Sequence, residues 1–135
     1  IRAAIPEMLK NGGGVIVNTA SIDGQVGMAT LAQYCAAKHG VIGLTKVCGL
    51  EYGSRNIRCV AVAPGYVETN MVAGVFTEAE TAGLLAMTPL QRACEPREVA
   101  ELVAWLASSK ASYVNGSVHT IDGGLTAGFV DMRPA

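Results

Sequence analysis

The sequence has few of the features that mark membrane, nucleic-acid-binding or secreted proteins. Only 16% of its 135 residues are charged, the net charge is −1, and no basic cluster offers a surface for nucleic acid. Its apolar runs are short and are interrupted by polar residues or glycine, so none approaches the length of a membrane span. The first residues also lack the long apolar core of a signal peptide. We therefore expect a cytoplasmic protein that binds neither membranes nor nucleic acid.

Metal ligands and disulfide patterns are scarce as well. The four cysteines, at positions 35, 48, 59 and 94, contain no Cys-x-x-Cys arrangement, and the two histidines, His39 and His119, lie far apart in the sequence. Cysteines that fall on predicted helices and strands are by default buried free thiols. The sequence therefore predicts a reduced, intracellular protein without a metal site.

Hydrophobic residues are abundant and follow an alternating order of helix and strand patterns. They make up 50% of the chain, which is typical of a packed domain. Short, β-branched apolar runs that suit buried parallel strands occupy residues 15–19, 57–62 and 117–121. Helices are predicted at residues 1–10, 31–53, 77–87 and about 96–106, the last beginning at a proline with Glu95 or Glu98 near its N-terminus.

This alternation predicts the fold class. Helices between buried strands favour right-handed β–α–β units and a parallel sheet. Three strands make a thin sheet with at least one bare edge, whereas parallel sheets are normally larger and covered. We therefore expect an α/β fold, a doubly wound parallel sheet of which this chain supplies only one part.

Glycines interrupt the longest predicted helix. Gly40, Gly43 and Gly49 each cost about 1 kcal/mol of helix stability relative to alanine. Their presence indicates close contact with another helix or with a ligand. Gly53 is expected to end the helix.

Polar residues follow the predicted strands at the edge where ligands bind in doubly wound sheets, which is beyond the carboxyl ends of the strands. Ser21 follows the first strand, and Pro64 and Gly65 follow the second. Tyr34 and Lys38 lie in the opening turns of the helix after the first loop. Three separate segments therefore place chemically useful groups at one crevice.

Tyr34 and Lys38 alone are an ordinary pair spaced four residues apart on a helix. They are separated by about 6 Å of rise and about 40° of rotation, so they share a helix face. A lysine ammonium near a phenol favours the phenolate, which would make Tyr34 a general acid/base near neutral pH. Ser21 would either donate a hydrogen bond to a substrate oxygen or cap a short turn.

Four stretches carry a resemblance to a known family: GGGVIVNTAS, YCAAK followed by HGVIGLT, IRCVAVAPGYVET, and YVNGSVHTIDGG. In this order and spacing they resemble the C-terminal, catalytic half of a short-chain dehydrogenase/reductase, from about Ile5 to Gly124. Ser21 precedes Tyr34 by thirteen positions, which matches the interval usual in that family.

The resemblance implies a Rossmann-like fold and an oxidoreductase that interconverts an alcohol and a ketone by hydride transfer, using NAD or NADP. Tyr34 would be the catalytic acid/base, Lys38 would favour its phenolate and hold the nicotinamide ribose, and Ser21 would orient the substrate oxygen. A homodimer or homotetramer is also implied. The cofactor-binding residues would be Tyr34, Lys38, Pro64, Gly65, Val67 and Thr69.

The glycine-rich phosphate turn of that family does not occur in these 135 residues, because Gly12, Gly13 and Gly14 follow a helix and precede a strand. Residues 1–135 are therefore expected to be the catalytic and substrate-loop part of one NAD(P)-binding domain, without its N-terminal dinucleotide-binding part. The alternative is a truncated, inactive homologue that serves as a binding or oligomer-forming module.

Residues 66–90 are expected to form the substrate loop, whose apolar side chains favour a substrate with a hydrophobic portion. Asp23 and Gln25 lie near the expected substrate mouth, either as solvated loop residues or as specificity contacts. His39 and Trp105 are interpreted as structural residues. The apolar loop residues are Met71, Val72, Val75, Phe76, Leu84, Leu85, Met87 and Leu90.

Overall fold

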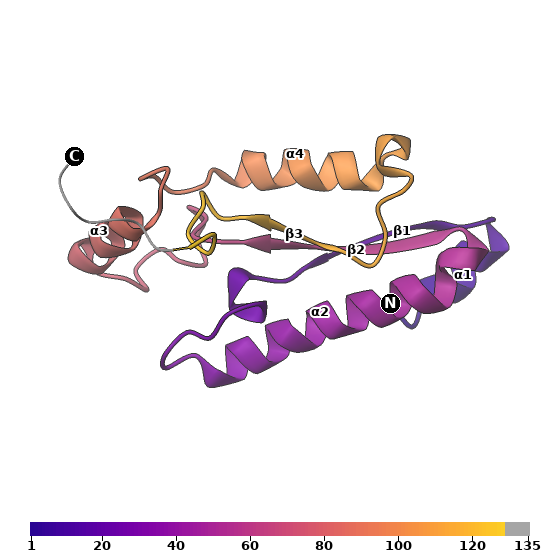
Figure 1. Ribbon diagram of the computed structural model, residues 1–135, viewed down its shortest axis with the longest axis horizontal. Helices are drawn as coiled ribbons and strands as arrows, with labels where there is room; N and C mark the ends of the chain where they lie inside the picture. Colours follow the sequence, from indigo (N-terminus) through magenta and orange to yellow (C-terminus); the bar gives the residue numbers. More distant parts are fainter. Residues whose placement is uncertain (129–135) are drawn as a thin grey trace.

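A sheet of three parallel strands forms the centre of the computed structural model, which describes residues 1–128 (Figure 1). The strands are β1 (Gly14–Thr19), β2 (Ile57–Pro64) and β3 (Val118–Ile121), and β2 lies between the other two. The predicted parallel α/β sheet is confirmed. Within residues 1–128, the outer edges of β1 and β3 pair with no further strand.

Helices cover both faces of this sheet. Figure 1 shows α1 (Ala4–Lys10) and α2 (Ala32–Tyr52) on one face and α4 (Pro96–Ala107) on the other. The helix α3 (Glu78–Met87) lies beyond the carboxyl ends of the strands. Short 3₁₀ turns η1 (Ile22–Gly24), η2 (Gly53–Arg55) and η3 (Ser109–Ala111) connect these elements.

The central strand β2 is apolar at every position except Arg58, because both of its faces are covered. Successive side chains of a strand point to opposite faces, so a strand covered on both sides favours apolar residues on each face. Ile57 and Cys59 pack with residues of α1 and α2, whereas Val60 and Val62 pack against Leu106 of α4.

Among residues 1–128, no helix has both the length and the apolar character needed to cross a membrane.

The cysteines are free thiols, as predicted, but only two of them are buried. Cys48 of α2 and Cys59 of β2 lie in the core between the helix and the sheet. Burial, followed by the hydrogen bond with Cys48, raises the pKa of the Cys59 thiol to about 12. Cys35 and Cys94 are only half-buried.

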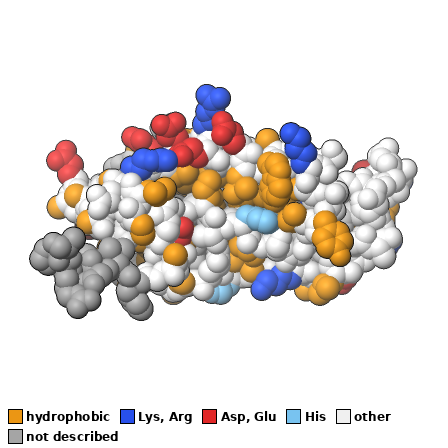
Figure 2. Space-filling model, turned by 45° about the horizontal axis from the view of Figure 1, so that its top comes forward, with side chains coloured by type: hydrophobic (Ala, Val, Ile, Leu, Met, Phe, Trp, Pro, Cys, Tyr) orange, Lys and Arg blue, Asp and Glu red, His pale blue; other side chains and the backbone are white. Residues whose placement is uncertain are grey.

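Both helices after β2 begin with strong caps. Thr77 and Glu80 form a capping box at α3, and Glu95 and Glu98 form one at α4, where Pro96 occupies the first turn. Arg97 and Glu101 form an ion pair one turn along α4. Figure 2 shows the resulting mixture of acidic and basic side chains over the α4 side of the molecule.

The glycines of α2 differ from expectation. A Cβ atom at Gly49 would lie 2.9 Å from the Cα atom of Gly116, so Gly49 permits contact with a loop rather than with a helix or ligand. Nothing among residues 1–128 lies within 4 Å of a Cβ atom built on Gly40 or Gly43. The helix ends at Tyr52, but Gly53 keeps a right-handed conformation, and the left-handed residue that turns the chain is Asn56.

The second strand is two residues longer than predicted. Ala63 and Pro64 continue β2 because they pair with Thr120 and Ile121 of β3. Proline is tolerated there, at the end of the strand, although it cannot donate a backbone hydrogen bond. The third strand begins at Val118, one residue later than predicted.

Candidate active site

An open cavity of about 410 Å³ lies at the carboxyl ends of the strands. Its volume is in the range of small-molecule sites. The residues predicted from the sequence to bind or act on ligands all line it: Ser21, Tyr34, Lys38, Pro64, Gly65, Val67 and Thr69.

Ser21 reaches this cavity because β1 ends at Thr19 and the chain then turns into η1. The backbone is extended at Ser21, and the side chain is buried. The Ser21 hydroxyl accepts a hydrogen bond from the Asp23 backbone N–H at 3.1 Å, so Ser21 does cap a short turn. Capping and substrate contact are compatible, because a hydroxyl oxygen has two acceptor positions and its proton can rotate.

Tyr34 and Lys38 project from the first turns of α2 into the same cavity. The Lys38 ammonium lies 5.4 Å from the centroid of the Tyr34 ring. It also donates a hydrogen bond of 3.0 Å to the carbonyl oxygen of Thr19, at the end of β1. The two side chains thus lie on one face of the helix, as predicted. The hydrogen bond to Thr19 fixes the position of Lys38 relative to the sheet.

The end of β2 supplies the opposite wall. Gly65 must lack a side chain, since a Cβ atom there would lie 2.9 Å from the Cβ atom of Asp122. Val67 forms an isolated parallel bridge with Cys94, which joins the two ends of the substrate loop. Thr69 follows at the start of that loop, and its carbonyl accepts hydrogen bonds from the backbone of Val72 and Ala73.

A second cavity of about 250 Å³ adjoins the first and shares Ser21 and Tyr34 with it. Five of the predicted substrate-loop residues line it: Met71, Val72, Val75, Phe76 and Leu84. Leu85 and Met87 line neither cavity, and Leu90 lines a different pocket. Phe76 packs edge-on against Tyr66, with ring centroids 6.0 Å apart, and both residues line the cavity.

One interpretation of the sequence placed Asp23 in solvent as a loop residue. That interpretation is wrong, because the side chain is buried. The η1 turn folds it beneath α2, where it is 7% exposed and lines the second cavity. Gln25 is exposed and bonds to Thr120 of β3, with 3.0 Å between the Gln25 amide nitrogen and the Thr120 hydroxyl. Within residues 1–128, His39 bonds to the Cys35 carbonyl and lines neither cavity.

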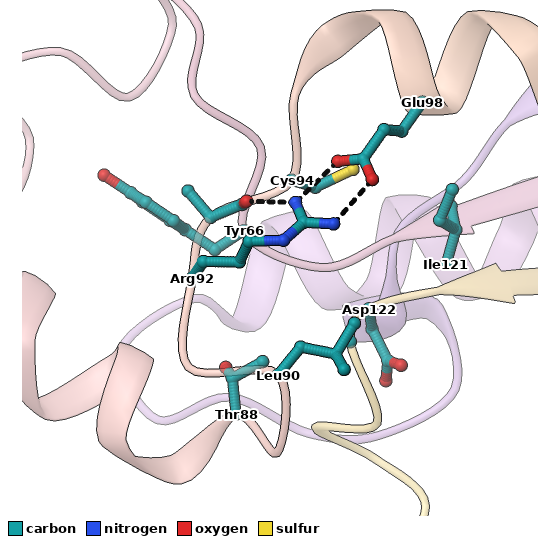
Figure 3. A pocket seen from close by; sticks show the side chains of 10 residues that line it. Tyr66, Thr88, Leu90, Arg92, Cys94, Glu98, Ile121 and Asp122 are labelled. Atoms are coloured by element: carbon teal, nitrogen blue, oxygen red, sulfur yellow. Dashed lines mark hydrogen bonds and ion pairs between the residues drawn. The ribbon is translucent and has the colours of Figure 1, made fainter.

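Arg92 and Glu98 form an anchor for the substrate loop that the sequence analysis missed (Figure 3). They make a bidentate ion pair with distances of 2.7 and 2.8 Å at a small pocket of about 60 Å³. Hydrogen bonds from Arg92 and then from the Glu95 backbone N–H lower the pKa of Glu98 to about 2. Burial and the nearby Glu98 carboxylate raise the pKa of the Cys94 thiol. The spacing of an arginine six residues before a helix glutamate gave no signal of this pair.

The arrangement suits proton transfer beside a bound organic ligand. The cavity offers a phenol, three aliphatic hydroxyls and one ammonium group, with an apolar cavity adjoining it. A phenol near a cation can exchange protons with a substrate oxygen. Among residues 1–128, no three His, Cys, Asp or Glu side chains gather as metal ligands would.

Comparison with known proteins agrees with this arrangement. The sequence model of the family described as "Enoyl-(Acyl carrier protein) reductase" matches residues 1–126. A cyclohexanol dehydrogenase from Acinetobacter sp. (strain SE19) is 46% identical over 123 residues, which cover 91% of this chain and 47% of that protein.

Solved structures that resemble this chain are also dehydrogenases. A putative 2-deoxy-D-gluconate 3-dehydrogenase from Agrobacterium tumefaciens with bound NADP has a TM-score of 0.89 at 36% identity, and the match covers 93% of this chain and 52% of that one. A 4-hydroxyisoleucine dehydrogenase mutant complexed with NADH and succinate has a TM-score of 0.91 at 32% identity, covering 96% and 54%. The chain thus spans about half the length of the relatives it matches.

Proposed function

The chain belongs to the short-chain dehydrogenase/reductase family, and we propose that it forms the catalytic part of an NAD(P)-dependent oxidoreductase that interconverts an alcohol and a ketone. The observation that carries the proposal is the convergence of Ser21, Tyr34 and Lys38 on one cavity from separate segments of the chain. Residues 1–135 would then be the catalytic and substrate-loop part of a single Rossmann-like domain.

The cavity residues fit a nicotinamide cofactor. The Lys38 ammonium and the Tyr34 hydroxyl are donors of the kind that bind ribose hydroxyls, and the turn at Pro64 and Gly65 leaves the strand ends accessible. Val67 and Thr69 line the same wall. NAD or NADP, when bound, supplies or accepts the hydride, and the protein contributes position and proton transfer.

The proton path follows from the side chains. In oxidation, the Tyr34 oxygen takes the proton of the substrate hydroxyl while hydride leaves the carbon atom that bears it. In reduction, Tyr34 returns the proton to the developing alkoxide. Lys38 places its positive charge 5.4 Å from the centre of the Tyr34 ring, and Ser21 donates a hydrogen bond that orients the substrate oxygen.

The second cavity supports a substrate with an apolar body. Its lining combines loop residues with Met28 and Leu31 from the segment before α2. A small molecule that places its reacting carbon near Tyr34 can extend between these side chains.

The four free cysteines within residues 1–128 support a reducing, cytoplasmic location.

Self-association through α2 is the second part of the proposal. Leu44, Val47 and Leu50 are 51%, 48% and 84% exposed along one side of the helix, so the described residues leave about half or more of each uncovered. An apolar stripe of this kind favours pairing with a second copy in a homodimer or homotetramer. The same surface is the feature that favours the alternative function, an inactive oligomer-forming module.

Replacing Tyr34 by phenylalanine tests the enzymatic proposal. In the full-length protein, turnover of ketones with NADH or NADPH should fall by about 10²- to 10⁴-fold, while cofactor affinity falls much less, because Lys38 remains as a donor to the ribose. Tyr113→Phe is the matched control, since Tyr113 is fully exposed and lines neither of these cavities. Near-normal turnover by Tyr34→Phe would exclude the assigned role, and a wild-type protein without turnover would favour the oligomer-forming module.

A further inference from the structure

Asp23 has unused hydrogen-bonding capacity inside the second cavity. It is 7% exposed and lines this cavity together with Ser21 and Tyr34. Its Oδ2 atom is 3.4 Å from the Ser21 hydroxyl, a long contact, and its Oδ1 atom is buried without a hydrogen-bond partner among residues 1–128. Buried polar atoms are almost always satisfied, so an exception at a cavity wall calls for a functional explanation.

The cavity offers Asp23 no compensating charge. Its lining, drawn from residues 1–128, contains no lysine, arginine or histidine. Lys38, the cation of the neighbouring cavity, is bonded to the Thr19 carbonyl. A carboxyl group in such a place repels anions and attracts hydrogen-bond donors, and both effects are stronger where water is excluded.

We propose that Asp23 determines substrate specificity: the second cavity selects alcohols and ketones whose apolar body carries a hydrogen-bond donor, a hydroxyl or ammonium group, and excludes bodies that carry a carboxylate. This inference rests on the proposed oxidoreductase function and names its substrate class. The ring or chain of the substrate packs on the apolar loop residues, and its donor group binds the free Asp23 oxygen.

The geometry permits this role without movement of the backbone. The last torsion of an aspartate side chain is broad and nearly two-fold, so rotation about the Cβ–Cγ bond exchanges the two oxygens. Such a rotation exchanges the positions of the two oxygens, and Asp23 itself is among the residues that line the cavity. The capping contact at Ser21 needs only the backbone N–H of Asp23, which would stay in place.

A purely structural role explains less. Support of η1 accounts for the Asp23 backbone N–H and for the long Ser21 contact. It leaves Oδ1 unexplained, and it does not explain why a carboxylate occupies a cavity wall that is otherwise mostly apolar. Burying such a group without a partner is costly, which a ligand donor would offset.

The test compares four ketones of similar shape: cyclohexanone, 4-hydroxycyclohexanone, 4-aminocyclohexanone and 4-oxocyclohexanecarboxylate. We expect the wild-type protein to favour the hydroxyl or amino ketone over cyclohexanone by about tenfold or more in kcat/KM, and to disfavour the carboxylate by a similar factor. The hydroxyl and amino compounds separate the two donor types.

Two variants separate charge from hydrogen bonding. Asp23→Asn removes the charge but keeps an acceptor, so it should accept the carboxylate about tenfold better relative to cyclohexanone and keep part of the donor preference. Asp23→Ala should lose both preferences. Glu78→Gln is the matched control, because Glu78 carries the same charge on the exposed first turn of α3 and should leave all ratios unchanged.

Ratios between substrates make the outcome decisive. A structural role for Asp23 would change kcat/KM for all four ketones by one common factor, and that result would overturn the inference. The dissociation constants of the same ketones, measured by ligand-observed NMR, give the specificity without turnover. Unchanged ratios with normal turnover refute the role of Asp23 alone, whereas absent turnover with the expected binding ratios refutes the proposed reaction alone.

Discussion

The Lys38 ammonium lies 5.4 Å from the centroid of the Tyr34 ring, one helical turn along α2. The lysine is held there by its hydrogen bond to the Thr19 carbonyl. This bond links the start of α2, which carries both side chains, to the end of β1. This contact turns an ordinary spacing into a fixed arrangement at the cavity. It also makes the role of the lysine testable apart from that of the tyrosine.

Lys38→Met should lower turnover by about 10- to 100-fold and weaken the binding of NADH or NADPH. The reason is that one positive charge near the protein surface contributes interaction energies of about one to a few kcal/mol, and each 1.4 kcal/mol is tenfold. Steady-state kinetics and a cofactor titration measure the two effects. Lys46→Met, on an exposed position of the same helix, is the control and should change neither. Equal behaviour of the two variants would contradict the assigned role of Lys38.

Gly49→Ala should destabilise the fold by about 1–3 kcal/mol, because the new Cβ atom would meet the Asn115 side chain and Gly116 at 2.9 Å. Gly83→Ala should stabilise it by about 0.5–1 kcal/mol, because Gly83 lies within α3 with nothing within 4 Å of the added atom. Urea unfolding followed by circular dichroism measures both changes. The prediction requires opposite signs, so two shifts in the same direction would refute it.

Acid should weaken the fold through Glu98. The ion pair with Arg92 and the Glu95 N–H lower the folded-state pKa of Glu98 to about 2, from an ordinary value of 4.5. A lowered pKa means that this stabilisation is fully present above pH 4.5 and is lost as the pH falls toward 2. Glu98→Gln should therefore flatten the decline in stability between pH 4.5 and 2, measured by chemical unfolding at each pH. Glu78→Gln, which also removes one exposed carboxylate, should leave the slope as it is in the wild type.

The elements that could be predicted from sequence are those specified by local pattern. The three parallel strands, the four helices and the capping box at Glu95 follow from apolar periodicity and terminal residues, which act over a few neighbouring positions. The cavity residues could also be predicted, because strands of a parallel sheet end at one edge and Ser21, Tyr34 and Pro64 each lie near such an end.

Other features depend on which segments meet. Gly49 faces a loop more than 60 residues later, and no periodicity along α2 indicates that partner. The pair formed by Arg92 and Glu98 arises because the substrate loop returns to α4. The continuation of β2 through Pro64 depends on pairing with β3, which local propensity does not report.

The sequence by itself determined the order of elements, the family and the group of Ser21, Tyr34 and Lys38, because these rest on residue types at short, regular spacings. Only the tertiary structure decided that Asp23 is buried at the wall of the second cavity, with one oxygen that has no hydrogen-bond partner among residues 1–128. The burial of a loop side chain depends on what packs over it, here α2, and that contact joins residues that are not neighbours in the sequence. The sequence allowed Asp23 to be a solvated loop residue. Its burial in the folded chain is the reason that we propose it to select the substrate.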